Sequence, residues 1–447
     1  MFGCGRGKVY KLKEVFVMNK LESYIEQLNA PAKADRLAAL QNIADMFKSG
    51  EIPMPERNED TNNHVHTTYS FSPYSPAKGV YMAYMSGLRT VGIVDHDAIN
   101  GADEFIKAGE ILGITTTIGM EIRVNFESVG YKGINLNNPD QPGTAYITFQ
   151  GVPHDSIEKL DKWLGENVRK YRHIRNRKMV ENINGLVNKL GVSLDYDKDV
   201  LPSSMAHDGG GVTERHILFA LTHKLMEKYT TGEAMLSFFE DDMGITVKES
   251  AKKLILDRDC PIYDYDVLNL LKSEFVAKMF VPATDELVDV KEAVRFAKEI
   301  GAIPSICYLG DVGDSVTGDK KAQKFEDEIL DDYIPVIKEI GFEALAYMPS
   351  RNTDAQIARI DALCRKYDFL QISGEDINQP RQKFVCMKLR EPGFKHLEDA
   401  TWALVGHEYA ATEDKEAGIY SDKTKAAFPN MEDRIAAFKE IGLKYRR

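Results

Sequence analysis

Apolar positions along much of the chain alternate between helical spacing and short continuous runs. Val290, Ala293, Val294 and Ala297 form a stripe at helical spacing, which Gly301 ends as a helix C-cap. The same order recurs; the predicted helices cover 99–112, 325–340 and 354–366, and the predicted strands read TVGIV, TTTIGMEIRV, IPSICYL, FEALAYM and FLQIS. Strands that alternate with helices are typical of parallel β/α units, whose functional residues gather at the carboxyl ends of the strands.

Two stretches interrupt this alternation. Residues 19–49 carry apolar side chains at helical spacing and are predicted to be helical, and residues 1–17 are expected to be a loosely ordered start-site extension. The middle of the chain is polar and helix-rich, which indicates a subdomain inserted into the barrel. The predicted segments are an N-terminal extension with helices (1–60), a first barrel part (61–154), an inserted helical subdomain (155–284), a second barrel part (285–390) and a C-terminal helical tail (391–447).

Composition narrows the possible partners. The chain has 447 residues, of which 43% are hydrophobic, and its net charge is −12. A sizeable core is therefore expected, and a surface this acidic argues against binding of long nucleic acid. The five cysteines form no Cys-x-x-Cys pair, and we find no membrane-spanning run and no secretion signal. These features favour a cytoplasmic protein, and the sequence sets no oligomeric state.

Ligand-type side chains are concentrated at the predicted strand ends in the first half of the chain. His64 and His66 lie two residues apart, so in an extended chain both imidazoles point to one side and can reach one ion. Asp95, His96 and Asp97 directly follow a predicted buried strand. The next predicted strand carries a charged residue within an apolar run. The alternative to a metal site is that His64 and His66 are two surface histidines in a loop. For Asp97 the alternative is that it caps the N-terminus of the following helix.

The charged residue of that next strand is Glu121. It is interpreted as a metal ligand, and the alternative is an outward-facing ion pair with Arg123. In the second half, the segment ISGEDINQPRQKF closes the last predicted strand and offers Glu375, Asp376 and, for an anion, Arg381. The alternative for that segment is an ordinary turn made of turn-forming residues.

The predicted subdomain contains a basic segment, RKYRHIRNRK at 169–178, with six Arg or Lys residues in ten. It is either a cationic wall that faces a phosphate or a solvated helix face. Arg215 and His216, in the sequence ERH, form a second candidate pair for phosphate binding.

These motifs resemble the PHP (polymerase and histidinol phosphatase) family of metal-dependent phosphoesterases. The resemblance rests on HVH, GLRTVGIVDHDAINGADEF, GMEI and the late SGEDIN, and it covers about residues 60–385. It implies an α/β fold, a distorted (β/α)7 barrel with a cluster of up to three Mn, Fe or Zn ions at the strand ends. RNRKMVENINGLVNKLG and ERHILFAL also resemble the helical subdomain of PHP enzymes that release phosphate from nucleotides.

Carried over residue by residue, the resemblance implies a complete first ligand set and two damaged ones. The complete set is His64, His66, Glu121 and Asp376, and His96 also matches as a ligand. The departures from the family pattern are Ser72 for Asp or His, Tyr308 for the His of Ala-His-Pro, Met348 for a His, and Asn378 for the closing His, while His154 looks misaligned for a further one. We therefore expect one firmly bound divalent ion and room for a weaker second, with Glu375 and Asp314 as compensating acids.

The resulting hypothesis is a metal-dependent hydrolase of phosphate esters, with a small phosphomonoester such as a nucleotide or sugar phosphate as substrate. His96 and Asp95 are the candidates for a further ligand or a proton shuttle, and Arg215, His216 and Arg177 for gripping the phosphate. The alternatives are a PHP-like binding or regulatory protein with an incomplete metal cluster, and a hydrolase of an amide or lactone. The basic segment speaks against the last, because a neutral substrate needs no arginines.

Overall fold

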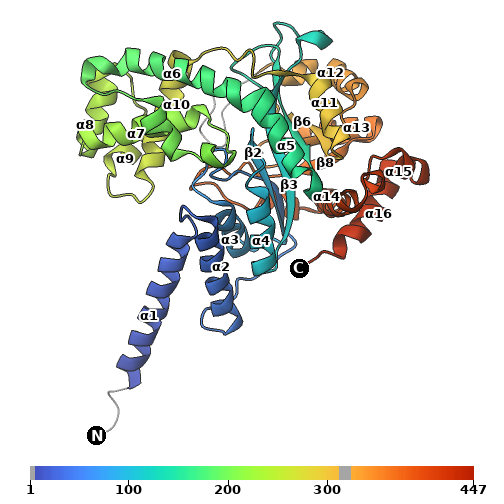
Figure 1. The fold of residues 1–447 in the computed structure, drawn as a ribbon, viewed down its shortest axis with the longest axis horizontal. Coiled ribbons are helices and arrows are strands. Elements are labelled where there is room, and N and C mark those ends of the chain that lie inside the picture. The colour runs from blue at the N-terminus through green and yellow to red at the C-terminus, as the bar shows by residue number, and fades with distance from the viewer. Residues whose placement is uncertain (1–5, 312–323) are drawn as a thin grey trace.

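The computed structural model describes residues 6–311 and 324–447 (Figure 1). The strands are β1 Thr61–Val65, β2 Thr90–His96, β3 Thr115–Asn125, β4 Thr144–Gln150, β5 Val288–Asp289, β6 Ile303–Tyr308, β7 Ala344–Tyr347 and β8 Leu370–Ser373. The helices before β6 are α1 Arg6–Gln27, α2 Lys33–Lys48, α3 Pro76–Met85, α4 Ala102–Leu112, α5 Ile157–Leu164, α6 Lys170–Val187, α7 Glu214–Lys228, α8 Gly232–Ser237, α9 Glu249–Leu256, α10 Tyr263–Met279 and α11 Val290–Glu299. Those after β6 are α12 Glu326–Ile340, α13 Asp354–Tyr367, α14 Lys395–Glu413, α15 Asp422–Ala427 and α16 Met431–Leu443.

Seven strands form one sheet in the order β1-β2-β3-β4-β6-β7-β8, and the short β5 pairs with β3. All neighbours on this path are parallel except β4, which runs antiparallel to both β3 and β6. The two ends of the sheet approach each other through a parallel bridge between Val65 and Ile377. The Asn63 side chain also donates to the carbonyl of Ser373 over 3.0 Å. The result is a nearly closed, distorted seven-stranded barrel, as the sequence predicts.

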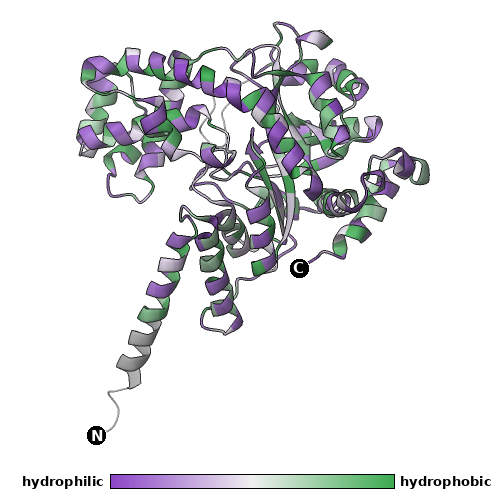
Figure 2. Cartoon of the chain, in the orientation of Figure 1, coloured by the Kyte–Doolittle hydropathy of each residue, from purple (hydrophilic) through white to green (hydrophobic). Residues whose placement is uncertain are grey.

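The sequence of β3 explains which face of this strand carries polar residues. In β3, Ile118, Met120 and Ile122 point outward and are buried in the main hydrophobic core under the helices. Glu121 and Arg123 alternate with them and face the other side of the strand. The colouring in Figure 2 shows hydrophobic residues concentrated in the central strands, whereas the surrounding helices alternate between hydrophilic and hydrophobic residues.

Helices α6 to α10 lie to one side of the barrel and have a hydrophobic core of their own (Figure 1). Its large buried side chains include Phe238, Phe239 and Phe275. Helix α14 packs across the barrel strands from the far side, where its Ala403 and Leu404 join Ile303 and other strand residues in a third core. None of the helices in 6–311 and 324–447 is both long and apolar enough to span a bilayer.

The N-terminal stretch is helical, as the sequence predicts. The structure divides residues 19–49 between α1 and α2, with Pro31 between them, where a helix would lose a backbone donor. Helix α1 already begins at Arg6, and the expected loose order of residues 1–17 stays a prediction. Residues 1–5 lie outside the described part of the chain.

Candidate metal centre

Neighbouring strands bring His96 and Glu121 together. In the parallel β2–β3 ladder these two residues form the last pair, where β2 ends at His96 while β3 continues past Glu121 to Asn125. Nδ1 of His96 lies 3.1 Å from Oε2 of Glu121. The imidazole of His66 stacks on that of His96 with ring centroids 4.6 Å apart, and its Nε2 lies 3.9 Å from the same carboxylate oxygen.

The loop after β8 brings Asp376 to the same place. It continues beside β1, because Ile377 donates to the carbonyl of His64 and accepts from the amide of His66. Oδ1 of Asp376 consequently lies 3.1 Å from Nε2 of His66. Nε2 of His64 lies 3.7 Å from Oε2 of Glu121. The predicted residues therefore converge in two overlapping groups, His64–His66–Asp376 and His66–His96–Glu121, each with ligand atoms within 4.8 Å of one another.

The chemistry of this cluster fits a divalent cation. Nε2 of His66 is buried and has no hydrogen-bond partner among the described residues. Burial lowers the pKa of His96 to about 3, so its ring is neutral and keeps a lone pair for a metal. Burial opposes the ionisation of Glu121, but the neighbouring histidines outweigh it and lower the pKa of Glu121 to about 2. Neutral imidazoles and ionised carboxylates are the forms that bind metal ions.

Asp95 lies beneath the cluster rather than in it. Its carboxylate accepts three hydrogen bonds of 2.6 Å, from the amide and hydroxyl of Thr67 and from the hydroxyl of Ser70. The Ser70 hydroxyl lies 3.3 Å from Nδ1 of His66. Asp95 is thus placed to orient His66 through Ser70, and it is too occupied to face a substrate as a proton shuttle.

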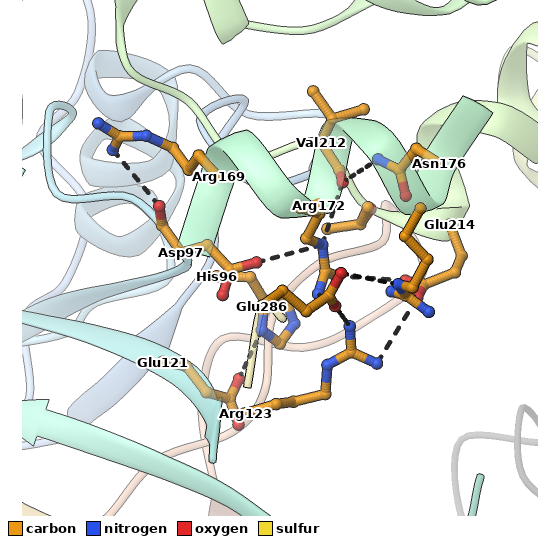
Figure 3. Close-up of polar contacts among 12 residues, drawn as sticks. His96, Asp97, Glu121, Arg123, Arg169, Arg172, Asn176, Val212, Glu214 and Glu286 are labelled. Atoms are coloured by element: carbon orange, nitrogen blue, oxygen red, sulfur yellow. Dashed lines mark hydrogen bonds and ion pairs between the residues drawn. The ribbon is translucent and has the colours of Figure 1, made fainter. Parts of the chain in front are cut away.

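Asp97 is not a helix cap, because Gly101 occupies the N-cap position of α4. The residue adopts a left-handed backbone conformation (φ 55°). Its carboxylate lies 3.3 Å from Nε of Arg172 on α6. Asp97 therefore links the end of β2 to the inserted helices (Figure 3).

The basic segment divides between solvent and interior, because Lys170, Arg177 and Lys178 are exposed whereas Arg172 and Arg175 are buried. Figure 3 shows Arg172 and Arg123 beside Glu214 and Glu286. Glu286 accepts from all three guanidinium groups, and Glu214 lies within ion-pair distance of each. With Asp97, three buried arginines face three carboxylates, so the network has no spare positive charge.

Two of the predicted phosphate contacts also have partners elsewhere. Arg177 makes an exposed bidentate ion pair with Asp197, with distances of 2.5 and 2.7 Å. Arg381 makes a bidentate pair with the buried Asp266, with distances of 3.0 and 2.7 Å. Neither side chain is directed at the cluster as an available phosphate ligand.

Arg215 and His216 occupy the first turn of α7. Arg215 is half-buried and makes no hydrogen bond or ion pair with the described residues, and its charge contributes to holding the pKa of Asp376 well below its usual value. His216 is buried, and its Nδ1 accepts from the amide of Thr213 over 3.0 Å. Burial lowers the pKa of His216 to about 3, so the neutral ring carries its proton on Nε2.

Comparison with known proteins agrees with this geometry. The sequence pattern of the PHP domain matches residues 62–343, which is more than half of the chain. The chain belongs to the PHP domain family. It is also 38% identical over 89 residues to a protein of Haemophilus influenzae named 5'-3' exoribonuclease. That match covers 20% of this chain and 32% of the relative, so the alignment spans about a third of the exoribonuclease.

Two solved structures are similar to this PHP protein. One is a Bifidobacterium adolescentis protein described as a metal-dependent phosphoesterase, with 20% identity, a TM-score of 0.48, and coverage of 75% of this chain and 95% of the other. The second is an amidohydrolase from Chromobacterium violaceum with bound sulfate and no metal, with 14% identity, a TM-score of 0.48, and coverage of 76% and 96%.

The departures from the PHP pattern have definite roles in the structure. Tyr308 is turned outward, and its hydroxyl donates to Asp327 over 2.5 Å, so it adds no ligand to the cluster. Asn378 donates to Oδ1 of Asp376 over 2.6 Å. The sulfur of Met348 accepts from the amide of Asp376 over 3.5 Å, so this side chain lies at the edge of the site.

The remaining candidates lie elsewhere. Ser72 is buried and its hydroxyl accepts from the amide of Tyr74. Glu375 accepts from Ser350 and is not in either group of converging ligand atoms, and Asp314 lies outside the described residues. His154 pairs with Glu408 of α14.

Sequence reasoning missed Thr67, Ser70 and Glu286. The first two were detectable, because a Thr-x-x-Ser pattern directly after His-x-His supplies hydroxyls beside the proposed ligands. Glu286 lies in a loop more than a hundred residues from its partners on α6, and no local pattern connects the two.

Proposed function

We propose that this PHP protein is a metal-dependent hydrolase of small phosphate monoesters, such as a nucleotide or sugar phosphate. The observation that carries the proposal is the convergence of His64, His66, Glu121, Asp376 and His96. The charge of Arg215, which makes no ion pair with the described residues, acts on Asp376 of this group. In this proposal His64, His66, Glu121 and Asp376 hold one divalent ion, and His96 with Glu121 serves a second, weaker position.

A bound divalent ion would supply a Lewis acid, which polarises a phosphoryl oxygen and makes water acidic enough to attack at neutral pH. The protein's own residues position the ester. Arg215 is the unpaired cation that can bind a phosphate oxygen, and His216 has a donor at Nε2 for another. Asp95 and Ser70 hold the His66 ring in one orientation, which keeps the lone pair of Nε2 directed at Asp376 and Glu121.

The balance of charge supports a small substrate. Three of the buried arginines near the cluster are already neutralised by carboxylates. One available guanidinium suits a single terminal phosphate, whereas a nucleic-acid backbone requires a series of positive contacts. The name of the Haemophilus relative nevertheless makes short oligonucleotides a necessary part of any substrate panel.

The test is hydrolysis of phosphomonoesters and short oligoribonucleotides by protein purified with Mn²⁺, compared with His66→Ala. His396→Ala is the matched control, because this histidine lies at the start of α14, away from the cluster. We expect phosphate release that stops with chelator and in His66→Ala but continues in His396→Ala. Equal activity of the wild type and His66→Ala would reject the proposed site.

A second candidate is a binding or regulatory protein that retains the barrel without turnover. Tyr308 and Asn378 favour it, because both replace family histidines and neither provides an imidazole. Little or no bound ion in the purified protein, together with an absence of hydrolysis across the whole panel, would favour this candidate over the enzyme, which should carry stoichiometric ion.

A further inference from the structure

A loop of the inserted helices contacts both loops that carry the proposed ligands. We name it the glycine clasp and define it as residues Asp208–Gly211. The hydroxyl of Tyr69, three residues after His66, donates to Asp208 over 2.5 Å. The amide of Gly211 donates to the carbonyl of Tyr69 over 2.7 Å. Tyr69 itself is only 1% exposed, so the clasp holds the first ligand loop through a buried residue.

The clasp also touches the second ligand loop, backbone against backbone. A Cβ atom at Gly211 would lie 2.3 Å from the carbonyl oxygen of His96, which is closer than any side chain permits. A Cβ at Gly209 would lie 2.4 Å from the side-chain amide of Asn100. Arg169 bridges the two segments, because it donates to the carbonyl of Gly209 over 2.9 Å and to that of Asp97 over 3.5 Å. Figure 3 shows the contact with Asp97.

The glycine clasp is followed in the chain by the start of α7, which carries Arg215. The carbonyl of Val212 accepts from Arg172 (3.2 Å) and Asn176 (2.8 Å) on α6. Thr213 then caps α7, and Arg215 follows in its first turn. The path of the clasp therefore fixes the ligand His96 on one side and the cation Arg215 on the other.

We propose that the glycine clasp is a positioning element that couples ion binding at His96 and Glu121 to anion binding at Arg215, with Gly211 as its positioning residue. A methyl group at this position must displace the His96 backbone, the clasp, or both. The inference rests on the proposed function for the identity of the ion site. Its readout is ion and phosphate binding, so it can fail while that function holds.

The experiment compares the wild type, Gly211→Ala and Gly185→Ala, with free Mn²⁺ followed by its paramagnetic resonance signal in the presence and absence of inorganic phosphate. Gly185 is the matched control, because it lies in α6 of the same insertion and a Cβ there meets nothing within 4 Å. We expect phosphate to tighten Mn²⁺ binding in the wild type and in Gly185→Ala. In Gly211→Ala, Mn²⁺ affinity should fall about tenfold or more, and the effect of phosphate should be lost.

A folded Gly211→Ala protein with wild-type Mn²⁺ affinity and phosphate coupling would overturn the proposal. If Gly211→Ala does not fold, Tyr69→Phe decides, because it removes the bond to Asp208 without adding an atom. It should weaken both Mn²⁺ affinity and coupling, and unchanged values would overturn the proposal. Wild-type Mn²⁺ affinity in His66→Ala would instead show that the ion site itself is misplaced, which separates failure of the proposed function from failure of the clasp.

Discussion

Asn378 donates a hydrogen bond from its side-chain amide to the carboxylate of Asp376 over 2.6 Å. The resemblance described above implies a histidine in the place of Asn378, where this chain instead has a group that orients a candidate ligand. Asn378 is 4% exposed, and the carboxylate oxygen that it bonds lies 3.1 Å from Nε2 of His66. Asn378 therefore contributes no imidazole and holds Asp376 in place beside His66.

Replacing Asn378 by alanine should loosen Asp376, because it removes the hydrogen bond that this side-chain amide donates to the carboxylate. We expect about tenfold weaker Mn²⁺ binding, the usual cost of losing a group that orients a ligand. Calorimetric titration with Mn²⁺ measures it. Asn182→Ala is the control, since that asparagine bonds only the Met279 carbonyl in the inserted helices. Affinity unchanged in Asn378→Ala would mean that Asn378 does not orient Asp376 for the ion.

The Ser70 hydroxyl should orient the His66 ring for ion binding, as the Asn378 amide orients the Asp376 carboxylate. Ser70→Ala removes the bridge between Asp95 and Nδ1 of His66 and leaves the ring free to rotate. We expect a loss of Mn²⁺ affinity of about tenfold to a hundredfold with little change in thermal stability. Ser203→Ala, at an exposed residue whose hydroxyl donates to the Val200 carbonyl, should bind Mn²⁺ normally. A loss of thermal stability in Ser70→Ala with unchanged affinity would assign Ser70 a purely structural role.

The buried arginine network should be a large contributor to stability. Glu286→Ala leaves Arg123, Arg172 and Arg175 with fewer carboxylates, and breaking a buried ion pair in this way costs about 3–5 kcal/mol. Urea unfolding measures the difference. The exposed pair of Arg177 and Asp197 provides the control, because Asp197→Ala should barely move the midpoint. A similar small shift for Glu286→Ala would show that the network is solvated.

The barrel and the convergence of the candidate ligands were predictable from the sequence, but the supporting contacts were not. The apolar pattern places Glu121 on a strand, and the register of β2 with β3 then brings His96 to it. The sequence does not tell whether Arg172 binds a phosphate or a carboxylate. In the structure its partner is Glu286, which is distant in sequence and comes close only in the folded chain. Likewise, the outward turn of Tyr308 follows from its bond to Asp327 across the β6–α12 connection. Such partners are set by tertiary packing, which local patterns do not encode.

Glu326 predicts a dependence of stability on pH. Burial raises the pKa of this carboxyl from 4.5 to about 8, although the amides of Leu309 and Gly310 bond to it. Because the pKa is higher in the folded protein, the protonated carboxyl stabilises the fold fully below pH 4.5, and this contribution is lost as the pH rises through 8. Over that window the wild type should lose on the order of a few kcal/mol that Glu326→Gln retains. Urea midpoints at pH 5 and pH 8.5 measure it, and parallel behaviour of both proteins would contradict the assignment.

The most direct test of the central claim is crystallography of Mn²⁺-soaked protein with data collected at the manganese absorption edge. The account predicts an anomalous peak bonded to Nε2 of His66 and to the carboxylates of Asp376 or Glu121, and its loss in His66→Ala. A wild-type map with no peak among these residues, or with a peak that persists in His66→Ala, would contradict the account.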